Sequence, residues 1–235
     1  MKSISKNNSK TKSRPRIAII GSQFFAKQMI PYIEETGQGQ VVGMFDDFEP
    51  AGLIKYHRSL LGPLKDVPLL YKNGQFDSVL NAVGYAHIEF RKNVFLQMKK
   101  HDIPVTTFIH PDSYIDSTVT VGEGCIVLMN CTICANVRLG DNIYVGPKSY
   151  IAHDVVIGSH CYVGPVVSIA GCSEIGESTF LGITSTVIDR IKIGKHVKIG
   201  AGAVVIQDLA DYVLAVGVPA SIKKNFNLTN KKAVP

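Results

Sequence analysis

The stretch VGPKSYIAHDVVIGSHCYVGPVVSI (residues 145–169) places an aliphatic residue at every sixth position. The same period runs from Ile109 to Val205, and all 17 positions at this spacing are Ile, Leu or Val. Nine of the residues that directly follow these positions are glycine. Neither an α-helix nor a simple hairpin array has a period of six, whereas a hexapeptide repeat is typical of a parallel β-helix.

Each group of six then forms one short strand and one corner, and three groups form a triangular turn of about 18 residues. The aliphatic residue points inward and stacks on its equivalents in the next turns, at a spacing of about 4.8 Å. Chains with hexapeptide repeats wind left-handed, an exception to the usual right-handed crossover. We therefore expect a left-handed parallel β-helix over residues 109–218.

The preceding segment, residues 16–108, alternates short apolar runs with helical patterns, as in a parallel sheet covered by helices. The last of these runs, PVTTF (104–108), is predicted to be a strand. The pattern as a whole predicts an α/β, Rossmann-like domain whose ligand lies at the carboxyl ends of the strands.

Three strand ends carry candidate binding residues: Gly21 and Ser22, Asp46 and Asp47, Gly84 and Tyr85. The loop GSQFFA (21–26) has one glycine where a dinucleotide fingerprint needs three, so a plain turn is an equal alternative. The two aspartates equally fit a solvated loop.

The net charge of +6 arises from basic residues at the two ends of the chain. Segment 1–16 holds six Lys or Arg and segment 221–235 holds four Lys, which leaves fifteen basic side chains against 19 acidic ones between them. We expect polar tails at 1–15 and 219–235, and no nucleic-acid partner, because the first tail has no aromatic residues. No apolar run approaches the length of a membrane span. Five cysteines without a C-x-x-C pair favour a reducing compartment, the cytoplasm.

Two histidines, His153 and His160, interrupt the quoted stretch. Their places in the repeat put both at corners and pointing away from the apolar column, His153 with Asp154 beside it. One interpretation is a pair of solvent-exposed corner residues. Another is a general base, since an imidazole can take a proton at neutral pH and a carboxylate can orient it. We predict no metal site, because His160 and His196 lie two turns apart, roughly 9–10 Å, too far to share one zinc ion.

The repeat also predicts which cysteines are buried and which are exposed. Three of them occupy the small inward position of a repeat and are expected in the core: Cys125, Cys131 and Cys161. Cys134 and Cys172 fall near corners and are candidates for exposed thiols.

The α/β segment, then FIHP (108–111), the uninterrupted repeats with His153-Asp154, and VGVPA (216–220) together resemble the bacterial nucleotide-sugar N-acyltransferases and their sialic acid O-acetyltransferase relatives. This resemblance implies a homotrimer with acetyl-CoA in the grooves between subunits. It makes His153 the catalytic base, assisted by Asp154. It places four residues along the cofactor: His160, Gly171, Ile183 and Ala201. The strand-end residues named above would hold the nucleotide sugar.

Three departures from the family pattern lie on the acceptor side. The first loop lacks a second Gly and a His, Arg91 comes seven positions after Gly84 instead of five, and Gly146-Pro147 replaces an Asn-Thr pair. The resemblance thus implies an acetyl-CoA-dependent N-acetyltransferase of a nucleotide-linked amino-deoxy sugar, of the 4-amino-4,6-dideoxy type, serving surface glycan synthesis. O-acetylation of a sugar or sialic acid is the alternative reaction, and an inert nucleotide-sugar-binding trimer is the alternative of another class.

Overall fold

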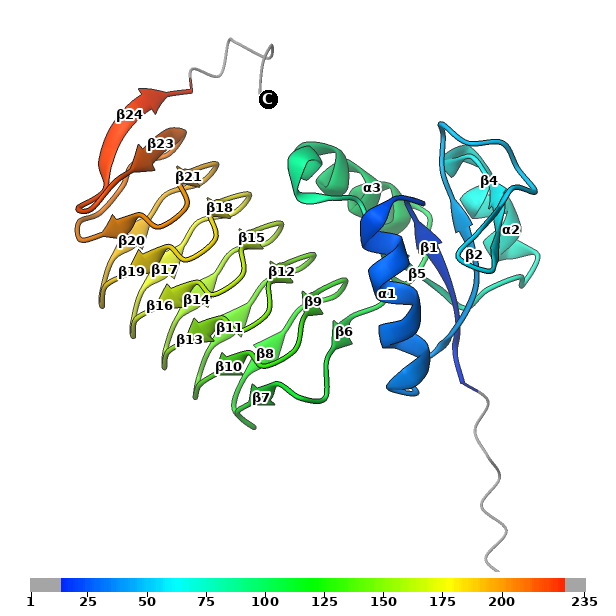
Figure 1. Ribbon diagram of the computed structural model, residues 1–235, viewed down its shortest axis with the longest axis horizontal. Coiled ribbons are helices and arrows are strands. Elements are labelled where there is room, and N and C mark those ends of the chain that lie inside the picture. Colours follow the sequence, from blue (N-terminus) through cyan, green and yellow to red (C-terminus); the bar gives the residue numbers. More distant parts are fainter. Residues whose placement is uncertain (1–13, 227–235) are drawn as a thin grey trace, which may run out of the picture.

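The computed structural model describes residues 14–226 (Figure 1). Most of the first expected tail and residues 227–235 of the second lie outside the described residues, whereas residues 221–225, which the sequence assigned to the second tail, form a strand paired with residues 213–216. The described chain consists of an α/β part followed by a long prism of short strands, with helix α3 (Ile88–Lys100) lying between them.

The α/β part contains a five-stranded sheet in the order β3-β4-β2-β1-β5. Four strands are parallel, and only β3 pairs antiparallel, with β4. The strands are β1 (Arg16–Ile20), β2 (Gln40–Phe45), β3 (Ile54–Lys55), β4 (Arg58–Gly62) and β5 (Ser78–Asn81). The helices are α1 (Phe24–Glu35), α2 (Val67–Lys72), α3 and the 3-10 turns η1 (Leu64–Asp66) and η2 (Tyr85–His87).

Alternating side chains of β1 bury both faces of this sheet, as the period of two requires. Ile17 and Ile19 pack in one cluster with α1, whereas Ala18 and Ile20 pack in another with α2 and α3. The expected helix-covered parallel sheet is confirmed. The strand expected at 104–108 is wrong, because only an isolated bridge joins Val105 to Val79. Pro104 has no N–H to donate to such a ladder, which limits the pairing there.

The prism consists of 17 two-residue strands, β6 to β22, and each ends on one of the 17 aliphatic positions. From Val127 to Val205 these positions are at most 4% exposed and form one apolar column. Each strand pairs in parallel with the strand three repeats further along the chain, so that three sheets run along the prism. The repeat and the parallel sheets agree with the left-handed β-helix expected from the sequence.

We name one face of the prism for the α/β part that covers it and the other two for their exposed side chains: the apolar face carries the exposed large apolar residues, and the polar face carries the charged ones. The apolar face consists of β7 (Tyr114–Ile115), β10 (Thr132–Ile133), β13 (Tyr150–Ile151), β16 (Ser168–Ile169), β19 (Thr186–Val187) and β22 (Val204–Val205). The polar face consists of β8 (Thr120–Val121), β11 (Arg138–Leu139), β14 (Val156–Ile157), β17 (Glu174–Ile175) and β20 (Lys192–Ile193). The covered face, against the α/β part, consists of β6 (Phe108–Ile109), β9 (Ile126–Val127), β12 (Tyr144–Val145), β15 (Tyr162–Val163), β18 (Phe180–Leu181), β21 (Lys198–Ile199), β23 (Val213–Val216) and β24 (Ser221–Asn225).

Three rows of corners join these faces, and the turn at most of these corners places one residue in the left-handed region. Between the apolar and polar faces this residue is Asp154, with φ of 58°, and we call this row the His153 corner. Between the polar and covered faces it is His160, with φ of 65°, in the row that we call the His160 corner. The third corner, between the covered and apolar faces, carries Ile183. Because the turns repeat the same geometry, side chains at one corner stack on their equivalents one turn away.

Candidate active site

The His153 corner presents an imidazole and a carboxylate side by side. His153 Nδ1 lies 2.8 Å from Asp154 Oδ2, and the two side chains are 63% and 49% exposed. An ionised carboxylate only accepts hydrogen bonds, so Nδ1 carries the proton and Nε2 keeps a free lone pair. The structure thus brings the predicted pair together.

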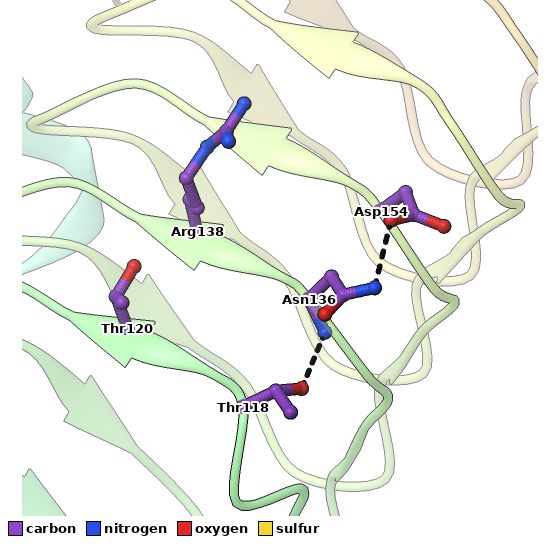
Figure 2. A pocket seen from close by; sticks show the side chains of 5 residues that line it. All are labelled: Thr118, Thr120, Asn136, Arg138 and Asp154. Carbon is purple, nitrogen blue, oxygen red and sulfur yellow. Dashed lines mark hydrogen bonds between the residues drawn. The ribbon is translucent and has the colours of Figure 1, made fainter.

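Asp154 is held by side chains of the preceding turns. Asn136 Nδ2 donates to its other oxygen, Oδ1, at 3.1 Å, and the Asn136 backbone N–H donates to Thr118 Oγ1 at 2.7 Å (Figure 2). The hydrogen bonds from His153 and then Asn136 hold the pKa of Asp154 below its ordinary value. The carboxylate is therefore charged at neutral pH.

A shallow hollow of about 370 Å³ opens on the polar face next to Asp154. It is bounded by five residues of three successive turns: Thr118, Thr120, Asn136, Arg138 and Asp154 (Figure 2). Arg138 provides the positive charge and also favours the ionised form of Asp154. Of the five lining residues, sequence reasoning singled out only Asp154. The signal for the others was their spacing, because positions 118, 136 and 154, like positions 120 and 138, recur once per turn of the repeat.

Gly171 lies one turn after His153, at the same corner. A Cβ built at residue 171 would lie 2.8 Å from both Cε1 and Nε2 of His153, closer than real contacts allow. The imidazole therefore rests against the bare backbone of Gly171. The family resemblance placed Gly171 along the cofactor. In this structure the missing side chain of Gly171 leaves room for the His153 ring.

The four residues expected along the cofactor lie at three different corners. Gly171 belongs to the His153 corner, whereas Ile183 and Ala201 lie on adjacent turns of the third corner, both exposed. The apolar face separates these two corners. His160 belongs to the remaining corner. The four residues therefore do not form one continuous surface within a single chain.

His160 stands at a corner outside the apolar column as expected, but the interpretation of it as a solvent-exposed corner residue is wrong. It is only 9% exposed, because α3 covers its corner and Phe95 packs edge-on against the ring at 5.5 Å. Its Nδ1 lies 3.1 Å from Asn142 Nδ2. Burial, and then the charge of Lys92, lower the pKa of His160, so the ring is neutral at neutral pH. A repeat specifies a corner but not what packs on it.

At the carboxyl edge of the sheet, the structure brings Gly21, Ser22 and Asp46 together. Asp46 Oδ2 accepts hydrogen bonds from the backbone N–H and the hydroxyl of Ser22, at 3.0 and 2.6 Å. Gly21 has φ of +96°, and a Cβ there would lie 3.2 Å from the carbonyl oxygen of Ala82. Asp46 is buried, and this arrangement fixes the β1 and β2 strand ends against each other.

The other predicted strand-end residues remain accessible. Asp47 is exposed, and its Oδ1 accepts the backbone N–H of Leu64 at 2.7 Å. Gly84 precedes η2, and Tyr85 in that turn is 63% exposed. Its ring lies 5.5 Å from that of Tyr162 on the covered face, so this strand end meets the prism.

Sequence reasoning missed an aromatic ladder on the covered face. Tyr144, Tyr162 and Phe180 stack in parallel, with ring centroids 4.7 and 4.9 Å apart. Phe25 of α1 packs edge-on against Tyr144. The signal was an aromatic residue at the same place in three successive turns of the repeat, and it marks the face that the α/β part covers.

Arg91, which the sequence singled out, lies on the buried side of α3. Its guanidinium donates to the carbonyl of Asn81, while Nε and Nη2 have no partner among the described residues. Burial lowers its pKa to about 10. Its extra distance from Gly84 therefore places it in the packing between helix and sheet.

No helix of residues 14–226 is both long and apolar enough to cross a membrane.

Comparison with known proteins identifies the family to which this chain belongs. The model for bacterial transferase hexapeptide repeats matches residues 136–171 and 172–207. The crystal structure of PerB from Caulobacter crescentus, solved with CoA and GDP-perosamine, is 30% identical and covers 88% of this chain and 97% of its own, with a TM-score of 0.81. This chain belongs to the bacterial nucleotide-sugar N-acyltransferases. As a member of that family it is an enzyme, an acyltransferase.

Two further structures extend the comparison. A variant of perosamine N-acetyltransferase from Caulobacter crescentus, with CoA and GDP-perosamine, is 29% identical over 89% of this chain and 97% of its own, with a TM-score of 0.82. The acetyltransferase domain of PglB from Neisseria gonorrhoeae is 21% identical and covers 89% of this chain and 100% of its own, with a TM-score of 0.79, and shares the fold of this acyltransferase. No curated protein matched the sequence.

Proposed function

We propose that this acyltransferase transfers an acetyl group from acetyl-CoA to the amine of a nucleotide-linked amino-deoxy sugar, of the 4-amino-4,6-dideoxy type, for surface polysaccharide or glycan synthesis in the cytoplasm. The observation that carries the proposal is the exposed His153–Asp154 pair, in a chain similar along nearly its whole length to an enzyme solved with CoA and GDP-perosamine.

The chemistry follows from the orientation of the imidazole. The sugar amine attacks the thioester carbonyl, and Nε2 of His153 takes the proton that the amine loses. Asp154 stabilises the imidazolium through the 2.8 Å hydrogen bond. The carbon–sulfur bond then breaks, and CoA leaves as the thiol after the imidazolium returns its proton. Backbone N–H groups at the corner are the donors available to the oxyanion.

The carboxyl edge of the sheet supports a Rossmann-like nucleotide site, with Gly21, Ser22, Asp46, Asp47, Gly84 and Tyr85 as its proposed lining. Asp46 orders the loop, while Asp47 is accessible to a ribose or base. Phe24, Phe48 and Tyr85 project from three neighbouring strand ends and are 77%, 91% and 63% exposed. Flat exposed side chains on such an edge suit stacking with a base or a sugar ring.

The distribution of apolar surface supports a homotrimer. Within residues 109–206, the exposed large apolar side chains lie on the apolar face or along its two edges: Tyr114, Tyr150, Val166, Ile183, Ile188 and Ile206. An exposed patch of this kind marks an interaction surface. Packing it against a second copy would bring Ile183 and Ala201 of one chain toward the His153 corner of another. Gly171, Ile183 and Ala201, which lie apart in one chain, would then line one groove for acetyl-CoA, whereas His160, buried under α3 at the remaining corner, would reach the cofactor only if α3 moved.

The test measures thiol release from acetyl-CoA with UDP-, GDP- and dTDP-linked amino sugars, their 4-hydroxy counterparts and free sialic acid. We expect release only with an amine acceptor. Release with the hydroxyl sugars or sialic acid alone would favour O-acetylation. No release with any acceptor, from a protein that still binds nucleotide sugar, would favour an inert binding trimer. Sedimentation of the same sample checks the oligomer, since a strict monomer contradicts the shared groove.

A further inference from the structure

Three metal-ligating side chains of different chemistry meet at the His153 corner. A ring nitrogen of His153, a carboxylate oxygen of Asp154 and the thiol of Cys172 all lie within 4.8 Å of one another, and all three residues are exposed. Cys172 follows Asp154 by three hexapeptides, at the same position of the next turn. The acetyl transfer proposed above does not require the thiol.

The backbone fixes the relative positions of these ligands. The N–H of Cys172 donates to the carbonyl of His153 at 3.0 Å, and the N–H of Asp154 donates to that of Ala135 at 3.0 Å. Asp154 and Cys172 share the left-handed conformation, with φ of 58° and 60°. Because these hydrogen bonds order the backbone of the corner, binding an ion would have to order only the three exposed side chains.

The donor set is that of zinc. Zn²⁺ binds Cys sulfur at about 2.3 Å and His nitrogen or carboxylate oxygen at about 2.0–2.2 Å, so two ligands of one ion stand roughly 3.3–3.8 Å apart. Forming the site would require the exposed His153 and Asp154 side chains, whose Nδ1 and Oδ2 lie 2.8 Å apart, to exchange their hydrogen bond for the ion, and the exposed Cys172 side chain to turn toward it. Three protein ligands leave a fourth position for water, as in open zinc sites.

We propose that His153, Asp154 and Cys172 bind one zinc ion per chain, and that the bound ion inhibits the enzyme. On binding, the thiol releases its proton to solvent and coordinates as the thiolate. The ion takes the lone pair of one ring nitrogen of His153, and the ring keeps its proton on the other nitrogen, so that neither nitrogen can accept the proton of the acceptor amine. The binding stands on the cluster alone, whereas the inhibition rests on the proposed function.

The other thiols provide the controls. Cys125, Cys131 and Cys161 are buried in the column, and burial raises the pKa of Cys125 to about 11 and of Cys161 to about 12. Cys134 is the matched case: it is partly exposed, lies on the turn before His153, and contacts the Tyr150 hydroxyl at 3.7 Å. It lies outside the three-residue cluster.

Calorimetric titration of the full chain with Zn²⁺ tests the binding, and titration with Co²⁺ reports thiolate ligation through its charge-transfer absorption. We expect one ion per chain and the thiolate band in the wild type and in Cys134→Ser. Cys172→Ser should lose the band, and its affinity for zinc should fall by more than about 100-fold, because losing a direct ligand costs more than losing an outer-shell partner. His153→Asn should also weaken binding, while keeping the thiol.

Equal zinc affinity in the wild type and Cys172→Ser, or a thiolate band that disappears in Cys134→Ser instead, would overturn the site. In the thiol-release assay, micromolar zinc should inhibit the wild type and Cys134→Ser, with recovery on adding EDTA, and should spare Cys172→Ser. Inhibition of all three variants alike would overturn the regulatory half. Zinc binding with no turnover on any acceptor would refute the proposed function and leave the metal site standing.

Discussion

The His153 and His160 corners are built from the same repeat and differ in what lies on them. Each places its histidine outside the apolar column, on turns of the same geometry. His153 has a carboxylate partner at 2.8 Å and stays exposed, whereas His160 is covered by α3, has an amide partner and is neutral. The comparison shows that corners of one scaffold expose or bury a histidine according to what packs on them.

His153→Asn should have the largest effect, because it removes the nitrogen that accepts the proton. We expect turnover to fall by about 100-fold to 10,000-fold, the usual contribution of a general base. Thermal unfolding should not change, since the side chain is exposed. Steady-state thiol release and a melting curve on the same sample measure both. Near wild-type turnover would remove the functional contrast between the two corners.

Gly171→Ala tests the same corner through its backbone. The new Cβ would displace the His153 ring, whose nearest atoms lie 2.8 Å from that position. We expect kcat to fall by about tenfold to 100-fold, the cost of a strained or lost hydrogen bond to Asp154. If KM for acetyl-CoA rises while kcat is unchanged, Gly171 contacts the cofactor instead of making room for the base.

His160→Ala should act on stability instead of turnover. It leaves a cavity beneath Phe95 and deprives Asn142 of its partner, which should lower the free energy of unfolding by about 1–3 kcal/mol. Urea unfolding followed by circular dichroism measures this, with His153→Ala as the matched control that should cost little. A large loss of turnover in a stably folded His160→Ala would instead support the predicted cofactor contact.

The smallest effect concerns pH. Because burial lowers the pKa of His160, the unfolded chain binds more protons there than the folded chain between the folded pKa and about 6.5. This stability is present above about pH 6.5 and is lost as the pH falls through the folded pKa. His160→Gln should have a shallower loss of stability in that window. An unchanged slope would show that the ring does not carry the dependence.

The sequence predicted most about the prism, where the same structural unit repeats along the chain. Seventeen aliphatic positions predicted seventeen strands, and the phase of the repeat placed His153 and Asp154 together at a corner. It was less informative in the α/β part, where α2 and the β3–β4 hairpin were not foreseen, and it did not reveal the aromatic ladder or the burial of His160. Those features depend on contacts between residues far apart in the chain, such as Phe95 with His160.

The sequence by itself determined the prism, because a period of six recurs locally and each turn buries the same kind of side chain against the last. It also determined which residues stand at corners, since that follows from counting. Only the tertiary structure decided which corner is open and which is closed. That depends on where α3 docks, because this helix covers His160 and leaves His153 exposed, and the docking is a property of packing between distant parts of the chain.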